Sequence, residues 1–367
     1  MTIIYTLIKN LPTLAIGLIG VGFIIAFHEL GHFLFCKIFG VKTPSFSIGF
    51  GPQLLKKKIG ETEFCISAIP LGGYVEIAGV QEVNQGSQLE AHRSDHFSFS
   101  AKPYYQKLLI LSGGILFNIL MAYAIMSVLS LIGAPKVSLN SDSVAPIIGR
   151  IFPGSAAEKY GLIQGDRILK INDENIESSS DLNRVIKSIP NQEVTLTVER
   201  DKKNIQISLV TDSIEQNKEQ VGQLGIHFAP EFDAPLPIVQ AIKNGFTKTN
   251  QMLIKTAQQY KMLFQNKMYK SIGGPIMLIS EVANSAKHGL RMFLLLLIIV
   301  SLNLAVLNLI PLPILDGGQI LFTTIEAIIG RQIPEGVRLT IHYICWISMI
   351  ALIVYLSYKD LFKIFSN

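Results

Sequence analysis

Four long apolar segments constrain the fold of this chain more than any other feature of its sequence. They lie within residues 1–40, 108–132, 290–320 and 339–358. A helix that crosses the hydrocarbon core of a bilayer needs about 20 predominantly apolar residues, and each segment holds a run of roughly that length. Only 16% of the residues are charged, whereas a soluble protein has about 25%. We therefore expect a polytopic α-helical membrane protein with four transmembrane helices in a lipid bilayer.

The first apolar segment contains a cluster of ionisable residues, His28, Glu29 and His32. Ionisable side chains are costly inside a bilayer, so such a cluster indicates a functional site. Residues four apart share a helix face, so the two imidazoles point the same way and can bind one Zn²⁺. Glu29 can then act as a base toward water at the metal, as in the H-E-x-x-H pattern. The sequence therefore predicts a zinc site in the first span.

The third zinc ligand must come from elsewhere, because catalytic zinc usually has three protein ligands and one open position. Asp316 directly follows the third apolar run, in a Leu-Asp-Gly-Gly sequence. The first and third spans run in the same direction, so their C-terminal ends emerge on the same side of the membrane. Asn118 lies near the start of the second span, which runs the opposite way and reaches that side too. Three separate regions are therefore expected to converge on one site.

The distribution of Lys and Arg predicts the orientation of the chain. Residues 37–107 contain eight of these basic residues, whereas the tails contain few. Short loops on the cytoplasmic side carry an excess of Lys and Arg. We therefore expect this loop and the metal site to face the cytoplasm, with both termini and residues 133–289 on the opposite side.

The regions between the spans have their own patterns. Residues 41–107 contain half-apolar strands interrupted by Gly and Pro, which predicts a β-rich, membrane-associated cytoplasmic loop. These strands could accept an extended peptide by strand addition, or they could simply pack on the spans. Residues 144–211 alternate short strands and helices, which predicts one small α+β domain. Residues 235–289 are amphipathic and are expected to return the chain to the membrane.

Composition and cysteine spacing argue against two kinds of site. The net charge is +5, and no basic cluster is interleaved with aromatic residues, so we expect no nucleic-acid partner. Cys36, Cys65 and Cys345 are far apart in the sequence. Their spacing matches neither a metal site nor a disulfide framework.

The motifs resemble those of a known family. The His-Glu-Leu-Gly-His, Gly-Gly-Ile-Leu-Phe-Asn and Leu-Asp-Gly sequences occupy residues 28–32, 113–118 and 315–317. In this order they resemble the site-2 protease family of intramembrane zinc metalloproteases, peptidase family M50. The four-span layout is similar to the bacterial regulator-of-sigma-E protease branch, and residues 153–169 resemble bacterial PDZ domains. The resemblance covers nearly the whole chain.

The resemblance implies a metal site, a base and substrate contacts. One zinc ion would be held by His28, His32 and Asp316, with Glu29 as the catalytic base. The asparagines that would lie near substrate are Asn118, Asn303 and Asn308. Asn118 could donate a hydrogen bond to a developing oxyanion. The expected substrates are single-span transmembrane proteins, such as anti-sigma factors or signal-peptide remnants, cut in regulated intramembrane proteolysis at the bacterial inner membrane. The PDZ-like domain would be extracytoplasmic and could bind a peptide ligand.

The chain departs from the family pattern in two places. It has one PDZ-like domain, where the best-known enterobacterial branch has two. Residue 319 is Gln, where many relatives have His. Because this His is not a zinc ligand in the family, the difference concerns specificity rather than catalysis.

Other interpretations stay open at this level. The chain could be a proteolytically silent membrane receptor that binds through its PDZ-like domain, although the intact Glu29 argues against this. A zinc transporter would need a polar path through the outer halves of the spans, which are nearly free of ionisable residues. Asp316 could form a turn without binding metal. Asn118, Asn303 and Asn308 could each stabilise a contact between helices instead of contacting substrate.

Overall fold

The computed structural model describes residues 2–80, 95–136, 144–216, 219–266 and 274–366. The chain forms two compact units. The first, here called the membrane unit, comprises Met1–Leu131 and Leu236–Asn367. The second, here called the inserted domain, comprises Ile132–Pro235. Part of the predicted β-rich loop (81–94) and part of the predicted return segment (267–273) lie outside the described residues.

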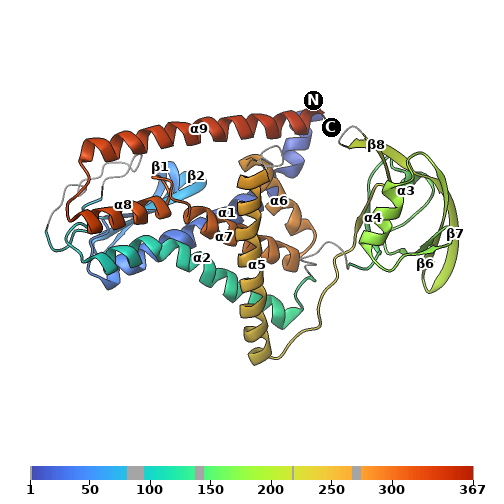
Figure 1. Cartoon of the computed structure of the whole chain (residues 1–367), viewed down its shortest axis with the longest axis horizontal. Coiled ribbons are helices and arrows are strands. Elements are labelled where there is room, and N and C mark those ends of the chain that lie inside the picture. The colour runs from blue at the N-terminus through green and yellow to red at the C-terminus, as the bar shows by residue number, and fades with distance from the viewer. Residues whose placement is uncertain (1, 81–94, 137–143, 217–218, 267–273, 367) are drawn as a thin grey trace. The chain divides into compact units, whose positions relative to one another are not determined.

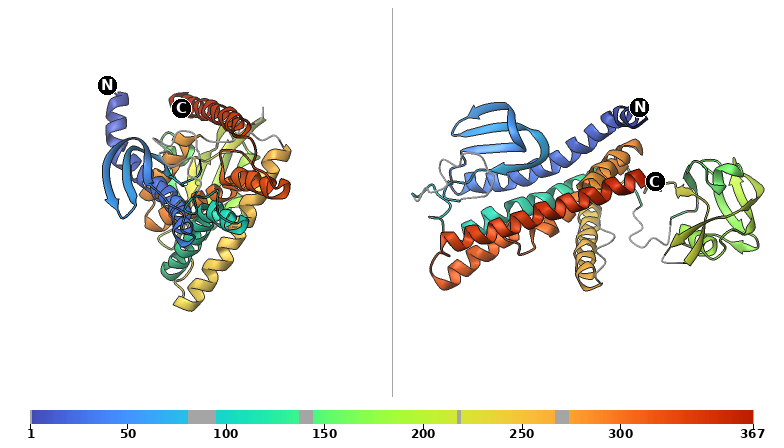
Figure 2. Two further views of the ribbon diagram at one scale, coloured as in Figure 1. Left: turned by 90° about the vertical axis from the view of Figure 1, so that its left-hand side faces the viewer. Right: turned by 90° about the horizontal axis from the view of Figure 1, so that it is seen from above.

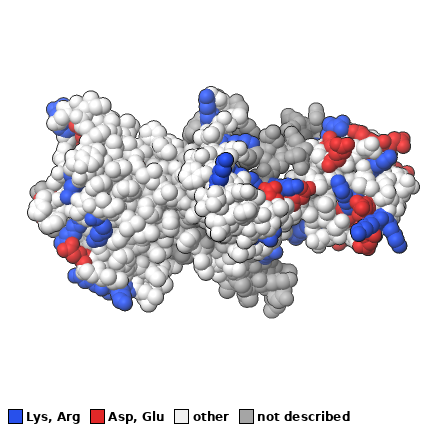
Figure 3. All heavy atoms as spheres, turned by 90° about the horizontal axis from the view of Figure 1, so that it is seen from below, with Lys and Arg blue, Asp and Glu red and all other residues white. Residues whose placement is uncertain are grey.

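Four helices of the membrane unit are long and apolar enough to cross a membrane, which makes this an integral membrane protein. Only 6% of the last span is buried within the protein, which leaves its apolar surface to lipid. On the face in Figure 3, the membrane unit has a broad uncharged surface, whereas both signs of charge mix over the inserted domain. The spans are Ala15–Ile38 in helix α1 (Thr2–Ile38), helix α2 (Tyr104–Ile132), helix α7 (Leu290–Asn308) and Gly336–Phe362 in helix α9 (Glu335–Ser366) (Figure 1).

The third apolar segment, residues 290–320, contains one spanning helix, a loop and the start of a second helix. Helix α7 ends at Asn308, and a separate helix, α8 (Asp316–Ile329), follows. Pro311 and Pro313 lie in the connecting loop. Proline lacks an N–H and fixes φ, so these residues oppose a continuous helix. The apolar pattern continues past the break, so the two prolines, and not hydropathy, indicate where the spanning helix ends.

The first loop contains a long β-hairpin of strands β1 (Ser45–Ile59) and β2 (Thr62–Val75). The strands pair antiparallel with several register shifts, which bend the hairpin. It lies beside α1 (Figure 2), with Phe46 and Phe64 against the ring of Phe33 at centroid distances of 5.5 and 5.6 Å. Edge-to-face contacts of this kind anchor the hairpin to the helix that carries the two histidines.

The predicted return segment forms two helices, α5 (Ile238–Asn266) and α6 (Pro275–Lys287). Helix α5 runs across the other long helices of the membrane unit (Figure 1). It packs on α2 through the stacked rings of Tyr123 and Phe246, whose centroids are 4.1 Å apart. Helix α6 packs on α1 and is tied to α9, because the Asp360 carboxylate accepts hydrogen bonds from the first N–H groups of α6.

The inserted domain is an α+β fold around one apolar core. Its main sheet has the order β5-β4-β6-β7, and two further pairs are β10-β3 and β8-β9. The domain is larger than the predicted 144–211, because the last strand returns to pair with the first. The elements are β3 (Ile148–Ile151), α3 (Ala156–Lys159), β4 (Arg167–Ile171), β5 (Glu174–Asn175), α4 (Ser179–Lys187), β6 (Glu193–Arg200), β7 (Lys203–Val210), β8 (Asp212–Gln216), β9 (Glu219–Gln223) and β10 (Ile226–Phe228).

An ion pair between the buried Asp166 and the partly exposed Arg200 ties the start of β4 to the end of β6. Arg200 Nε and Nη2 donate to the two Asp166 oxygens at 2.8 and 2.7 Å, and the Ile163 N–H adds a bond of 3.0 Å. Burial by itself raises the pKa of the Asp166 carboxyl, but the bonds from Arg200 and Ile163 outweigh it and hold that pKa below its ordinary value. The pair therefore stabilises the domain while Asp166 is ionised.

Candidate metal centre

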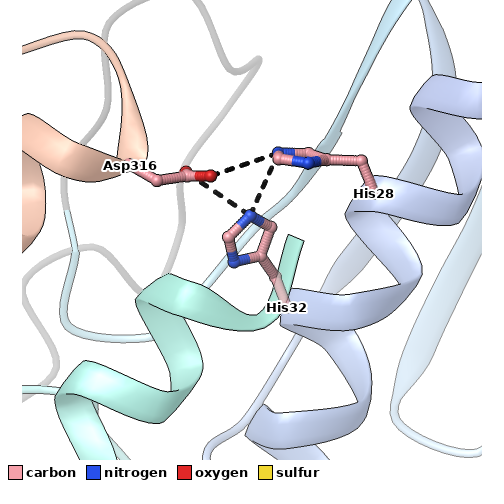
Figure 4. A group of neighbouring side chains, drawn as sticks. All are labelled: His28, His32 and Asp316. Atoms are coloured by element: carbon pink, nitrogen blue, oxygen red, sulfur yellow. Dashed lines mark hydrogen bonds and ion pairs between the residues drawn. The ribbon is translucent and has the colours of Figure 1, made fainter. Parts of the chain in front are cut away.

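Three side chains from distant parts of the chain meet inside the membrane unit (Figure 4). His28 and His32 lie one turn apart on α1, and Asp316 is the first residue of α8. The two Nε2 atoms are 3.3 Å apart. Asp316 Oδ2 lies 3.3 Å from His28 Nε2, and Asp316 Oδ1 lies 3.4 Å from His32 Nε2. The structure thus brings together the three residues that the sequence predicted as ligands.

The spacing of these atoms fits one zinc ion. Ligand atoms about 2.0–2.1 Å from a tetrahedral ion lie roughly 3.4 Å from one another. The three separations, 3.3, 3.3 and 3.4 Å, agree with this value. Two imidazole nitrogens and a carboxylate oxygen are donor types that zinc binds, and three such ligands leave a fourth position for water or substrate.

The Nδ1 atoms of both imidazoles, which do not face Asp316, have partners on α2. His32 Nδ1 donates to the Ile110 carbonyl oxygen at 2.8 Å. His28 Nδ1 lies 3.1 Å from the side-chain amide of Asn118. Such outer contacts orient a metal-binding imidazole and set its tautomer. They explain why both Nε2 atoms point toward Asp316.

Glycines allow α1 and α2 to approach closely at this point. A Cβ on Gly31 would overlap the carbonyl oxygen of Gly113. A Cβ on Gly114 would overlap the His28 ring and lie 2.5 Å from His32 Nε2. Small residues let helix backbones pack closely in membranes. Here the close approach brings the α2 partners within hydrogen-bond reach of the imidazoles.

Asp316 is positioned by the loop that breaks the third apolar segment. A Cβ on Gly317 would lie 2.5 Å from Leu309 O, and one on Gly318 would overlap Leu312 O. The Asp-Gly-Gly sequence is therefore a helix start with the preceding loop folded against it, rather than a simple turn. Gln319 Nε2 donates to Pro313 O at 2.6 Å, which holds the loop in place.

A cavity of about 1120 Å³ adjoins the three side chains. Glu29 contributes to its wall and is partly exposed there. Gly73 of β2 lies against this carboxylate side chain, since a Cβ on it would be 3.1 Å from Glu29 Cγ. Trp346 and Ile350 of α9 also contribute to the wall. The cavity therefore places the predicted base, the three candidate ligands and the backbone of the hairpin around one space.

The predicted asparagines occupy different places. Asn308 lines the cavity, and its Nδ2 lies 3.2 Å from His28 Nε2. Asn118 is fully buried and does not line the cavity, so it lies behind the imidazole instead of facing a substrate as expected.

Asn303 is directed away from the three ligands. Its Oδ1 accepts from the Tyr260 hydroxyl of α5 at 3.0 Å, and its Nδ2 donates to Ile299 O at 2.7 Å. Both ends of the amide are therefore used in contacts within and between helices. Of the two roles that the sequence left open for this residue, a contact between helices and a contact with substrate, these hydrogen bonds are of the first kind.

Sequence reasoning missed the Ile110 carbonyl and the structural role of the glycine pair. A backbone carbonyl has no side-chain signature, so no pattern could have pointed to Ile110. The Gly113-Gly114 pair was visible as a site of close packing, but its partner, the histidine turn of α1, depends on how the two helices cross.

Comparison with known proteins decides the family. The model for peptidase family M50 matches residues 16–352. The chain belongs to peptidase family M50. This confirms the resemblance drawn from the three motifs. The protein is therefore a zinc metalloprotease of this family.

Individual relatives agree with the family assignment. A Fusobacterium nucleatum protein is 32% identical over 357 residues, which is 96% of this chain and 100% of the relative. A Helicobacter pylori protein is 29% identical over 360 residues, covering 95% and 97% of the two chains. Both are provisionally named zinc metalloproteases. Among solved structures, the PDZ domain of an SdrC-like protein from Listeria innocua covers 25% of this chain and 100% of its own, with 18% identity and a TM-score of 0.21.

Proposed function

We propose that this M50 protein is an intramembrane zinc metalloprotease that hydrolyses peptide bonds within the transmembrane segments of single-span membrane proteins. The observation that carries the proposal is the convergence of His28, His32 and Asp316 beside a cavity that also holds Glu29. The site lies among helices that can cross a membrane. A site so placed acts on a substrate that enters from the bilayer.

The donor set supports zinc as the resident metal. The ligands would be His28 Nε2, His32 Nε2 and one oxygen of Asp316, with one ion per chain. When bound, zinc would act as a Lewis acid that polarises the scissile carbonyl and lowers the pKa of water from about 15.7 to about 7.

Glu29 is the residue that moves protons. Its carboxylate follows a ligand directly in sequence and lies on the wall of the cavity. It accepts a proton from the attacking water as the new C–O bond forms. It then donates this proton to the leaving amine as the C–N bond breaks.

The substrate must be locally extended when it is cut. A helix uses its own carbonyl groups in hydrogen bonds, and breaking these in lipid is costly unless other groups replace them. The hairpin backbone around Gly72 and Gly73 borders the cavity, and the Asn308 amide also faces it. These groups would hold the unwound segment by strand addition and by amide hydrogen bonds.

The remaining assignments concern location and partners. The basic loop at residues 37–107 supports a cytoplasmic site in a bacterial inner membrane, with the termini and the inserted domain outside. The inserted domain is proposed as a PDZ-like module that binds a peptide end or strand. Anti-sigma factors and signal-peptide remnants are the substrate types that fit regulated intramembrane proteolysis.

The test is a comparison of wild type with Glu29→Gln in membranes. Removing a general base is expected to slow cleavage on the order of 10²–10⁴-fold, while the purified variant keeps about one zinc per chain by elemental analysis. Membrane proteomics should then show single-span fragments that accumulate uncleaved. Glu281→Gln, at an exposed position on α6, is the matched control and should cleave normally.

Two outcomes would contradict the proposal. Undiminished cleavage by Glu29→Gln would remove the base from the mechanism. Wild-type membranes with no cleavage of any single-span protein, despite bound zinc, would favour a silent receptor.

A further inference from the structure

We propose that Asn118 is a positioning residue for zinc: its side-chain oxygen accepts a hydrogen bond from His28 Nδ1–H and thereby leaves His28 Nε2 free to bind the ion. The inference rests on the proposed zinc site. It gives Asn118 a role different from the oxyanion donor that the family resemblance suggested.

The two imidazoles have the same geometric task. Both Nε2 atoms face Asp316 and both Nδ1 atoms face α2. A neutral imidazole carries one N–H and one free nitrogen. If Nε2 binds the metal, the hydrogen is on Nδ1 and needs an acceptor. His32 has such an acceptor in Ile110 O, at 2.8 Å.

For His28 the corresponding partner is the Asn118 amide. Its nitrogen lies 3.1 Å from His28 Nδ1, and its Oδ1 is buried without a hydrogen-bond partner among the described residues. Two N–H groups cannot bond to each other, so an Nδ1–H requires the oxygen at this place. A half-turn of the planar amide exchanges oxygen and nitrogen with almost no change in shape. After that rotation Oδ1 accepts from Nδ1–H.

The surroundings fix Asn118 in this position. The residue is fully buried, and its backbone carbonyl accepts a hydrogen bond from Ser301 Oγ of α7 at 2.9 Å. Gly114, one turn earlier on α2, leaves room for the imidazole. Asn118 also does not line the cavity. Asn118 therefore does not reach the substrate, but it can act through His28, the zinc-binding residue that it contacts.

The outer partners of metal-binding histidines typically change metal affinity 10–100-fold when removed. Asn118→Leu has a similar size but no acceptor, so its zinc affinity should fall 10–100-fold. Asn118→Asp keeps an acceptor oxygen and loses the donor, so it should bind zinc at least as tightly as wild type. Ser130→Ala removes another buried polar contact of α2, the bond from Ser130 Oγ to Met126 O, which touches neither Asn118 nor His28, and its zinc affinity should be unchanged.

The measurement is zinc affinity of the full-length protein in detergent, by competition with a chelator of known affinity. Thermal unfolding is recorded in parallel for each variant. A purely structural role of Asn118 would weaken zinc binding in both Leu and Asp variants. An oxyanion donor would leave zinc affinity equal in all of them and change only cleavage.

Three results overturn the inference: an Asn118→Leu protein that binds zinc like wild type, an Asn118→Asp protein that binds zinc as weakly as Asn118→Leu, or a Ser130→Ala protein with weakened zinc binding. If Asn118→Leu fails to fold, the Asp variant decides, since a tenfold loss there excludes the acceptor role and retained affinity supports it. Wild-type protein that binds no zinc would instead refute the proposed function, so the two failures are distinguishable.

Discussion

Replacing Gly114 by alanine tests whether the metal centre depends on the close approach of α1 and α2. The added Cβ would lie 2.5 Å from His32 Nε2 and 2.6 Å from His28 Nδ1. Ordinary contacts between such atoms are about 3.5–4.0 Å. The two imidazoles, or the whole histidine turn, must therefore move by about 1 Å.

That displacement is large compared with the tolerance of a metal site. Metal–ligand distances are held to about ±0.2 Å, and losing one outer partner already costs about 10–100-fold in affinity. Because both ligands move, we expect Gly114→Ala to lose at least about 100-fold in zinc affinity. Overpacking costs about 1–3 kcal/mol, and alanine recovers about 0.5–1 kcal/mol over glycine in a helix. The net loss of stability should be about 1–2 kcal/mol.

The assay is chelator competition for zinc, together with thermal unfolding in the same detergent. Gly336→Ala is the matched control, because a Cβ at this position of α9 meets nothing within 4 Å. It should bind zinc like wild type and be equally or slightly more stable. If Gly114→Ala binds zinc with wild-type affinity, the inference that this glycine contact sets the ligand geometry is wrong.

Three further perturbations test other parts of the structure. Asp166→Asn should destabilise the inserted domain by about 2 kcal/mol, because Arg200 and the Ile163 N–H lose the charged acceptor to which they donate, and faster hydrogen exchange in β4 and β6 would report it. Since the pKa of Asp166 is lowered on folding, the stability that its ionised carboxylate contributes should be complete above about pH 4 and decline as the pH falls below that. Amide protection in β4 and β6 that stays constant below about pH 4 would contradict this. Asp360→Leu should lower stability by about 2 kcal/mol, because two N–H groups at the start of α6 lose their acceptor, and an unchanged melting temperature would show that this cap is dispensable. Removing zinc with a chelator should lower the melting temperature of wild type and Glu29→Gln alike, since a ligand of the folded state stabilises it, and no shift in either protein would argue against a bound ion.

Sequence alone determined the features that depend on local chemistry. Four apolar runs predicted four spanning helices, because the bilayer sets their length and requires backbone groups to bond within each segment. The spacing of His28 and His32 fixed one helix face, and Glu29 came with it. Spans one and three run in the same direction, so their order also placed Asp316 on the same side of the membrane as the two histidines. These inferences needed only helix periodicity, hydropathy and connectivity.

Only the tertiary structure decided what depends on how helices cross. The break between α7 and α8 lies inside a continuous apolar run, and its geometry follows from a loop that packs on Gly317 and Gly318. Asn118, Asn303 and Asn308 look equivalent in sequence, yet one lies behind a ligand, one is held by α5 and one faces the cavity. Polar residues in a span are informative about function, but their direction depends on helix packing, which hydropathy and motif spacing do not encode.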